Sequence, residues 1–151
     1  MCINFKNLIR ITFILILNNL HSQTLDIAKN IKTIILNNSK STDPFFSFDD
    51  NIELSFDDLD SDEKNYYYQI NHFDYNWKPS KLLKSEYLNG FDDLRIRKYR
   101  NSFNTLKSYT NYKLKIPNND LSLKISGNYS ISIHHSNGDR VFEKRFSIFK
   151  N

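Results

Sequence analysis

Hydrophobic and polar residues alternate with a period of two along most of the chain. Successive side chains of an extended strand point to opposite faces, so this alternation predicts strands with one buried face. The clearest case is Tyr66–Phe73, in which Tyr66, Tyr68, Ile70 and His72 share one mainly apolar face. The other predicted strands are, in chain order, Asn30–Leu36, Ile52–Asp57, Leu94–Arg97, Asn111–Ile116, Asn128–Ile133 and Phe142–Ile148.

Turn-forming residues separate these strands. Asn137-Gly138 has the residues that a two-residue type I′ hairpin turn requires, and Pro117 ends the strand before it. Lys81–Leu88 fits either a short helix or a long connection. About seven short strands without a long amphipathic helix predict an all-β fold, an antiparallel β-sandwich of immunoglobulin-like type.

Trp77 is the only tryptophan, and it follows the strongest strand just before Pro79. Burial of an indole removes roughly 150–250 Å² from water, so we expect Trp77 to lie in the core. In that case Trp77→Ala costs about 3–5 kcal/mol.

The first residues have the pattern of an export signal. Lys6 and Arg10 precede a short apolar run, Ile11–Leu17, which is far shorter than the roughly 20 residues of a membrane span. We therefore expect a signal peptide over residues 1–22, cleaved near Ser22/Gln23, and one exported domain over residues 23–151 without a transmembrane span.

Removal of residues 1–22 changes the cysteine content and the net charge of the expected exported domain. Cys2, the only cysteine, is lost, so the exported domain has no disulfide. Loss of Lys6 and Arg10 lowers the formal net charge from +4 to +2. A chain that is exported and close to neutral does not fit nucleic-acid binding, which favours a strongly basic domain.

Two groups of residues resemble parts of metal sites. Asp58, Asp60 and Asp62 have the spacing of the first ligands of an EF-hand loop, but Glu63 and Gln69 stand where that loop needs Gly and a bidentate Glu. We therefore favour a solvated acidic turn. His134 and His135 are adjacent on a strand and face opposite sides, which does not suit one metal ion.

His72, Asp74 and Ser80 are the residue types of a catalytic triad. His72 and Asp74 are two apart on a strand, so they lie side by side and do not form a relay to a third group. We favour a structural histidine, and we predict no catalytic residues, no cofactor and no small-molecule substrate.

Five segments resemble the first domain of the type IX secretion system plug proteins of Bacteroidetes. They are Leu54–Leu59, Tyr66–Gly90 with its His72-x-Asp74-x-x-Trp77-x-x-Ser80 motif, Ser102–Thr105 with Tyr109-x-x-Tyr112, Ser126–Tyr129, and Arg145-Phe146. The resemblance covers about Ile31 to Phe149. The chain departs from the family at Phe73, where cysteine is usual, and in its length, because family members continue further.

The resemblance implies a non-enzymatic periplasmic subunit, peripheral to the outer membrane. Its partner would be the translocon barrel of the type IX secretion system, whose periplasmic end it would close. Interfaces of this kind favour aromatic and arginine anchors. The candidate contacts are the turn Asp74–Trp77 with Asp74 and Tyr75, the loop Ser102–Thr105 with Ser102 and Asn104, and the basic strand Arg95–Arg100 with Arg95 and Arg97.

An exported glycan-binding module is the alternative. Sandwiches that display aromatic rings on one face bind sugars by stacking, and Tyr67, Phe73, Tyr75 and Trp77 would form that platform. This alternative requires that Trp77 be exposed. For the basic strand, we favour a charged solvent face that protects a sheet edge from association over a partner-binding patch.

Overall fold

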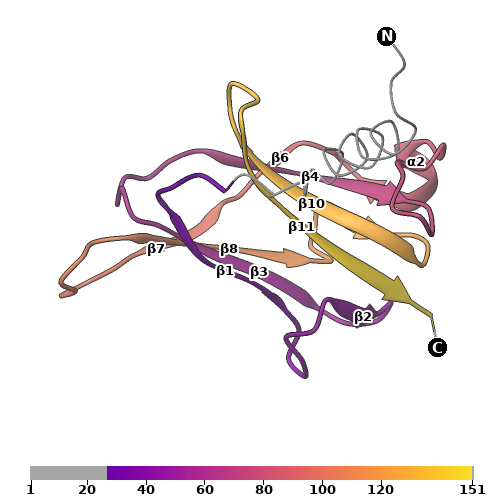
Figure 1. Cartoon of the computed structure of the whole chain (residues 1–151), viewed down its shortest axis with the longest axis horizontal. Coiled ribbons are helices and arrows are strands. Elements are labelled where there is room, and N and C mark those ends of the chain that lie inside the picture. Colours follow the sequence, from indigo (N-terminus) through magenta and orange to yellow (C-terminus); the bar gives the residue numbers. More distant parts are fainter. Residues whose placement is uncertain (1–26, 151) are drawn as a thin grey trace, which may run out of the picture.

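The computed structural model describes residues 27–150, so the expected signal peptide over residues 1–22 lies outside the described residues. Two sheets face each other, with β4, β10 and β11 above β1, β3 and β8 in Figure 1. The strands are β1 (Ile31–Asn37), β2 (Phe45–Ser47), β3 (Ile52–Asp58), β4 (Tyr66–Phe73), β5 (Leu88–Gly90), β6 (Leu94–Arg95), β7 (Lys98–Asn101), β8 (Thr110–Ile116), β9 (Leu121–Leu123), β10 (Gly127–His135) and β11 (Arg140–Phe149). One helical turn, α2 (Lys84–Tyr87), precedes β5.

The strand order is that of an immunoglobulin-like sandwich. One sheet has the order β1-β3-β8-β7 and the other β2-β11-β10-β4-β6, with a small third sheet formed by β5 and β9. Lettered along the chain, β1, β3, β8 and β7 correspond to the ABED sheet, and β11, β10, β4 and β6 to the GFCC′ sheet. All named pairs are antiparallel except β2 with β11. The predicted fold class is confirmed.

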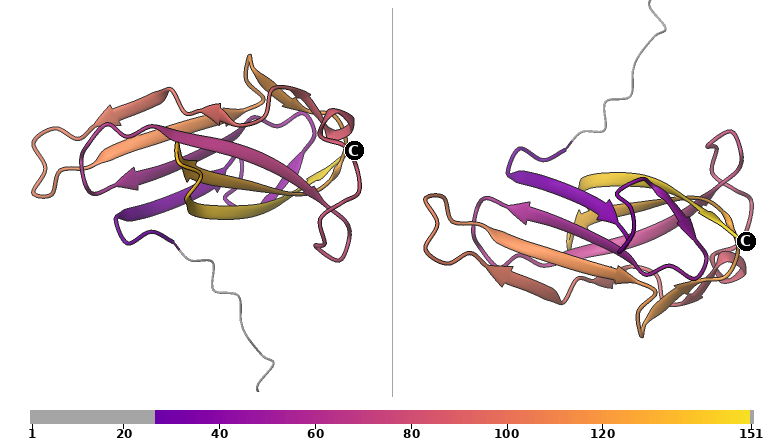
Figure 2. Two further views of the ribbon diagram at one scale, coloured as in Figure 1. Left: turned by 90° about the horizontal axis from the view of Figure 1, so that it is seen from above. Right: turned by 90° about the horizontal axis from the view of Figure 1, so that it is seen from below.

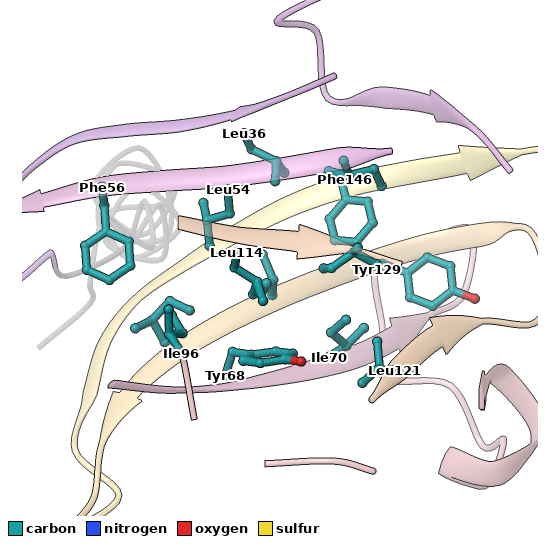
Figure 3. Packing of buried hydrophobic residues seen from close by; sticks show 14 of the residues in the cluster. Leu36, Leu54, Phe56, Tyr68, Ile70, Ile96, Leu114, Leu121, Tyr129 and Phe146 are labelled. Carbon is teal, nitrogen blue, oxygen red and sulfur yellow. The ribbon is translucent and has the colours of Figure 1, made fainter. Parts of the chain in front are cut away.

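Apolar side chains from both sheets fill the space between them. Leu54 and Leu114 extend from the four-stranded sheet toward Ile70 and Tyr129 of the five-stranded sheet (Figure 3). At one end of the core the Phe56 ring stacks on Tyr112, with ring centroids 5.2 Å apart. The face of β4 that alternation predicted to be buried does point inward. Its first three members, Tyr66, Tyr68 and Ile70, are 2% exposed or less.

Two predicted elements are wrong in detail. Leu94–Arg97 is not one strand, because the chain leaves the five-stranded sheet after β6, buries Ile96, and enters the four-stranded sheet as β7. The Asn137-Gly138 hairpin is not a two-residue type I′ turn. Gly138 donates to the His135 carbonyl and alone has a left-handed φ of 89°, so Ser136 and Asn137 form the turn and Gly138 follows as a bulge.

The acidic turn after β3 is organised by a buried carboxylate, contrary to the expectation of a solvated turn. Asp58 has no exposed surface and accepts hydrogen bonds from Asn30 Nδ2 at 2.7 Å, Tyr66 Oη at 2.8 Å and the Asp60 amide at 3.0 Å. Lys64 Nζ lies 3.1 Å from its second oxygen. Protein donors thus occupy the Asp58 oxygens that a metal ion would need. Over residues 27–150, no three His, Cys, Asp or Glu side chains gather closely enough to hold a metal.

One edge of the sandwich has a charged residue on its inner face. β2 pairs only with Ser147–Phe149 of β11, and Lys144 lies before this pairing begins. Lys144 is opposite Ile131, which is fully buried, and paired residues of antiparallel strands share a face. Lys144 is therefore a half-buried, inward-facing lysine at the edge of the sheet.

No helix within residues 27–150 has the length and apolar character of a membrane span.

Candidate binding surfaces

Two of the three candidate contact patches lie at opposite ends of the sandwich. The turn Asp74–Trp77 follows β4 at one end, and the loop Ser102–Thr105 joins β7 to β8 at the other (Figure 2). The structure therefore does not bring the three predicted patches together. We call the first the β4 turn and the second, with its two strands, the β7–β8 hairpin.

Asp74 holds the β4 turn in one conformation. Its Oδ1 accepts hydrogen bonds from the amides of Asn76 at 2.8 Å and Lys78 at 2.9 Å, and its own amide donates to the Lys78 carbonyl. Asp side chains favour such turns because they replace backbone acceptors. Asp74 is thus a structural residue of the turn, which leaves Tyr75, 87% exposed, as its displayed side chain.

Trp77 lies outside the core, which corrects the sequence-based expectation. It is half-buried on the outer face of the five-stranded sheet, where its ring packs against Phe73 with centroids 5.9 Å apart. The Arg145 guanidinium lies 5.1 Å from the Trp77 ring centroid and 5.9 Å from that of Phe73, within cation–π range. The reason lies in the backbone. β4 ends at Phe73, and the turn that follows, in which Trp77 has a left-handed φ of 58°, folds the indole back onto Phe73 on the outer face.

Asn128 fixes the β4 turn to the sheet. Its Nδ2 donates to the Asp74 carbonyl at 3.0 Å, and its Oδ1 accepts from Ser147 Oγ at 2.8 Å. The turn, β10 and β11 are therefore joined by one chain of hydrogen bonds. Tyr75 and the stack of Phe73, Trp77 and Arg145 form a preorganised surface, which we call the aromatic end.

The β7–β8 hairpin is closed at its base by two hydrogen bonds. The Ser102 amide donates to the Tyr109 carbonyl at 2.8 Å, and the Tyr109 amide donates to Ser102 Oγ at 2.9 Å. Asn104 has a left-handed φ of 55°, a conformation that asparagine tolerates. Ser102 thus shapes the loop, and the side chains that the loop displays are Phe103, 93% exposed, and Leu106, fully exposed.

The outer face of the hairpin is a basic groove. Ser102 and the loop residues Phe103 and Thr105 line it together with Lys98 and Arg100 of β7 and Lys113 of β8. The structure therefore brings the predicted loop and the second half of the basic segment onto one surface. Arg95 and Arg97 lie apart from this groove. Arg95 is opposite Tyr67 at the outer edge of the other sheet, and Arg97 is exposed where the chain crosses between the sheets.

The four aromatic residues of the alternative glycan platform form two separate groups. Tyr67 lies at the start of β4 and stacks on His134, with centroids 6.0 Å apart, whereas Phe73 and Trp77 lie at the other end of that strand. Tyr67 and His134 border a polar depression together with Asp93, whose Oδ1 is 3.0 Å from His134 Nε2. His135 packs on Tyr66 instead, which confirms that the two histidines face opposite sides.

His72, Asp74 and Ser80 do not form a relay. The His72 ring lies between Tyr87 and Tyr129 and against Gly127, and burial lowers the pKa of His72 below its ordinary value. The Asp74 carboxylate is directed at its own turn. The Ser80 backbone amide donates a hydrogen bond to the His72 carbonyl at 3.0 Å. The three side chains are therefore not joined in a catalytic arrangement.

The sequence did not single out Phe103 and Leu106 as exposed side chains of the hairpin loop, or Arg145 as the residue that packs on Trp77. For the hairpin a signal was present: Leu94–Asn119 contains seven Lys and Arg and no Asp or Glu. For Arg145 none was present, because its contact with Trp77 depends on a turn conformation that alternation does not encode.

Comparison with known proteins agrees with this geometry. Residues 31–150 match the family model described as "Type 9 secretion system plug protein 1st domain". A crystal structure of a hypothetical protein from Parabacteroides merdae is similar, with 33% sequence identity and a TM-score of 0.77 over 82% of this chain. The match spans 33% of that longer protein. A search of curated proteins gives no match. The family match covers nearly every residue that the structure describes, so this chain belongs to the type 9 secretion system plug protein first-domain family and is a type IX secretion-related protein.

Proposed function

We propose that this domain is a non-enzymatic periplasmic subunit of the type IX secretion system that contacts the outer-membrane translocon barrel and helps to close its periplasmic end. The family match over residues 31–150 carries this proposal. The expected signal peptide would deliver the chain to the periplasm. The function requires a rigid, specifically shaped surface rather than a catalytic centre.

The aromatic end is the surface best suited to a protein partner. Binding hot spots are enriched in Trp, Tyr and Arg and are surrounded by side chains that exclude water. Here Tyr75 projects from a turn that Asp74 and Asn128 fix, beside the stack of Trp77 on Arg145. A preordered surface loses little conformational entropy on binding, which favours affinity.

The test is an affinity pull-down from solubilised envelopes of the organism that makes the protein. The tagged full chain is expressed there, envelopes are extracted with mild detergent, and retained proteins are identified by mass. We expect recovery of the secretion barrel, through an interface of at least about 1,000 Å². A folded chain that retains no envelope protein would contradict the proposal.

A pair of variants locates the contact. Tyr75→Ser removes the displayed ring of the aromatic end and should lower recovery of the barrel, whereas Phe45→Ser removes another exposed ring, on β2, and should not. Equal recovery with both variants would move the contact to another surface. The tagged chain should also appear in the periplasmic fraction with a new N-terminus near Gln23.

A further inference from the structure

We propose that the β7–β8 hairpin docks this domain on an anionic phospholipid surface, with Phe103 and Leu106 entering the headgroup region. This inference goes beyond the proposed contact with the barrel and uses residues at the opposite end of the sandwich (Figure 2).

The tip of the hairpin displays apolar surface that the fold does not cover. Phe103 is 93% exposed and Leu106 is fully exposed, the two highest values among the large hydrophobic residues described. Both lie in the loop that extends beyond the ends of the neighbouring strands (Figure 1). Single exposed apolar residues are common on proteins, but two neighbouring ones at a projecting tip indicate an interaction site.

The tip is held in place before any contact is made. The reciprocal bonds between Ser102 and Tyr109 close its base, and Thr105 Oγ1 donates to the Lys107 carbonyl at 2.9 Å within it. The adjoining strand β8 is paired on both sides, with β3 and β7. The apolar side chains are therefore presented on a base that is ordered in advance.

Positive charge lies directly behind the tip. Lys107 is in the loop, and Lys98 and Arg100 point outward from β7; all three are exposed and form no ion pair with any residue of the described chain. Three carboxylates lie nearby: Glu53 is ion-paired with Lys113 at 2.8 Å, Glu63 accepts from Tyr99 Oη at 2.7 Å, and Asp57 accepts from Asn111 Nδ2 at 2.7 Å. The hairpin thus presents three cations without an ion-pair partner in the described chain, within a segment, Leu94–Asn119, that contains no Asp or Glu.

Apolar side chains at a tip and cations set behind them match the layers of a phospholipid surface. Aromatic and aliphatic side chains enter the boundary between headgroups and acyl chains, while Lys and Arg attract anionic headgroups and extend toward them. The tip is convex, and a protein partner would need a pocket shaped to receive it. A membrane accepts a convex tip without such a pocket.

The experiment is flotation of the processed chain with phospholipid vesicles. The chain is purified after export, so that it is the form the cell makes, and mixed with vesicles of phosphatidylethanolamine and phosphatidylglycerol or with vesicles of phosphatidylcholine alone. We expect binding to the anionic vesicles only, weakening as salt screens the charges. A folded chain that floats with neither kind of vesicle overturns the proposal.

Two variant pairs test the two layers. Phe103→Ser with Leu106→Ser should lower vesicle affinity by roughly tenfold or more, whereas Leu83→Ser with Phe91→Ser, which removes residues 70% and 73% exposed elsewhere, should leave it unchanged. Lys98→Glu with Arg100→Glu should lower the affinity and flatten its dependence on salt.

Two outcomes separate this proposal from the contact with the barrel. Loss of vesicle binding in the tip variants, with barrel recovery retained, supports the proposal whatever the function of the aromatic end. An equal loss in the tip and control variants, or tip variants that alter only protein recovery, would assign the hairpin to another contact and overturn it.

Discussion

Asp58 has no exposed surface, so protein groups have to stabilise its charge. Burial disfavours the charged form, but the Asp60 amide, Asn30, Tyr66 and Lys64 together outweigh this effect and lower the pKa of Asp58 below its usual value. Burial and the neighbouring Asp58 raise the pKa of Tyr66, which therefore remains a hydrogen-bond donor. This cluster ties the end of β3 to the start of β4.

The lowered pKa of Asp58 makes stability depend on pH on the acid side. In the unfolded chain the pKa of an Asp carboxyl is about 3.9. The stabilisation is therefore fully present above that pH, and it is lost as the pH falls through the lower pKa of the folded state. Asp58→Asn should cost about 1.5–3 kcal/mol at neutral pH, with the difference from the parent shrinking in acid. Urea unfolding at stepped pH measures this.

The exposed Asp43 provides the control. Asp43→Asn should change stability by no more than about 0.5 kcal/mol at neutral pH. A cost of Asp58→Asn that stayed constant into acid would show that the carboxylate contributes by shape rather than by charge.

Trp77 has a large side chain at a backbone position with positive φ, where residues that carry a Cβ atom are strained. At a φ of 58° an L-residue is strained by about 1–2 kcal/mol, and glycine is not. Trp77→Gly should therefore be less destabilising than Trp77→Ala by about 1 kcal/mol, the reverse of the order in ordinary extended chain. Thermal unfolding of the two variants compares them, and an Ala variant as stable as the Gly variant would contradict the prediction.

Sequence reasoning at the scale of single residues succeeded where alternation holds. It placed Tyr66, Tyr68 and Ile70 in the interior because residues two positions apart on a strand lie on the same face of the sheet. It failed for Trp77, because composition predicts that an indole seeks burial but cannot reveal a left-handed residue. It also failed for Asp58, whose burial depends on Asn30, distant in sequence.

At the scale of elements, the packing of the His72 ring of β4 against the start of β10 requires a glycine. A Cβ on Gly127 would lie 2.3 Å from His72 Nε2, and the φ of Gly127 is +150°. Gly127 therefore allows the His72 ring to pack close to the backbone of β10, beside Tyr129.

Gly127→Ala should destabilise the domain by about 1–3 kcal/mol through overpacking, in addition to backbone strain. Gly138→Ala is the matched control, because Gly138 also has a positive φ but nothing lies within 4 Å of an added Cβ. Its cost should be limited to the strain, about 1 kcal/mol. Urea unfolding measures both.

A double variant separates clash from strain. His72→Ala removes the ring that the new methyl group meets, so it should cost less in the Gly127→Ala background than in the parent chain. Strictly additive costs would show that the clash is relieved by movement of the ring and that backbone strain alone remains.

The longer strands were predictable and the short ones were not. β3, β4 and β8 show several alternations each, and the structure confirms them within about one residue. β2, β5 and β9 have three residues each, too few for a period to be visible. The end of β6 at Arg95 leaves the alternation of exposed Arg95, buried Ile96 and exposed Arg97 intact, so no local pattern could have revealed that the chain then crosses to the other sheet.

For the whole molecule, the number of strands and their spacing were enough to predict the sandwich. They could not predict which loops meet, because that depends on strand order in the two sheets. The sequence therefore identified the β4 turn and the β7–β8 hairpin as separate patches but could not show that they lie at opposite ends. In the two proposals made above, one end of the sandwich contacts a protein and the opposite end contacts a lipid surface.

The inward-facing lysine of β11 has a consequence for behaviour at high concentration. Extended segments of other chains can pair with free sheet edges, and such pairing becomes more frequent as protein concentration rises. A foreign strand added along β11 next to Lys144 would enclose the ammonium group between apolar layers, at a cost of several kcal/mol. The single charge of Lys144 thus disfavours association of this edge with an extended segment of another chain.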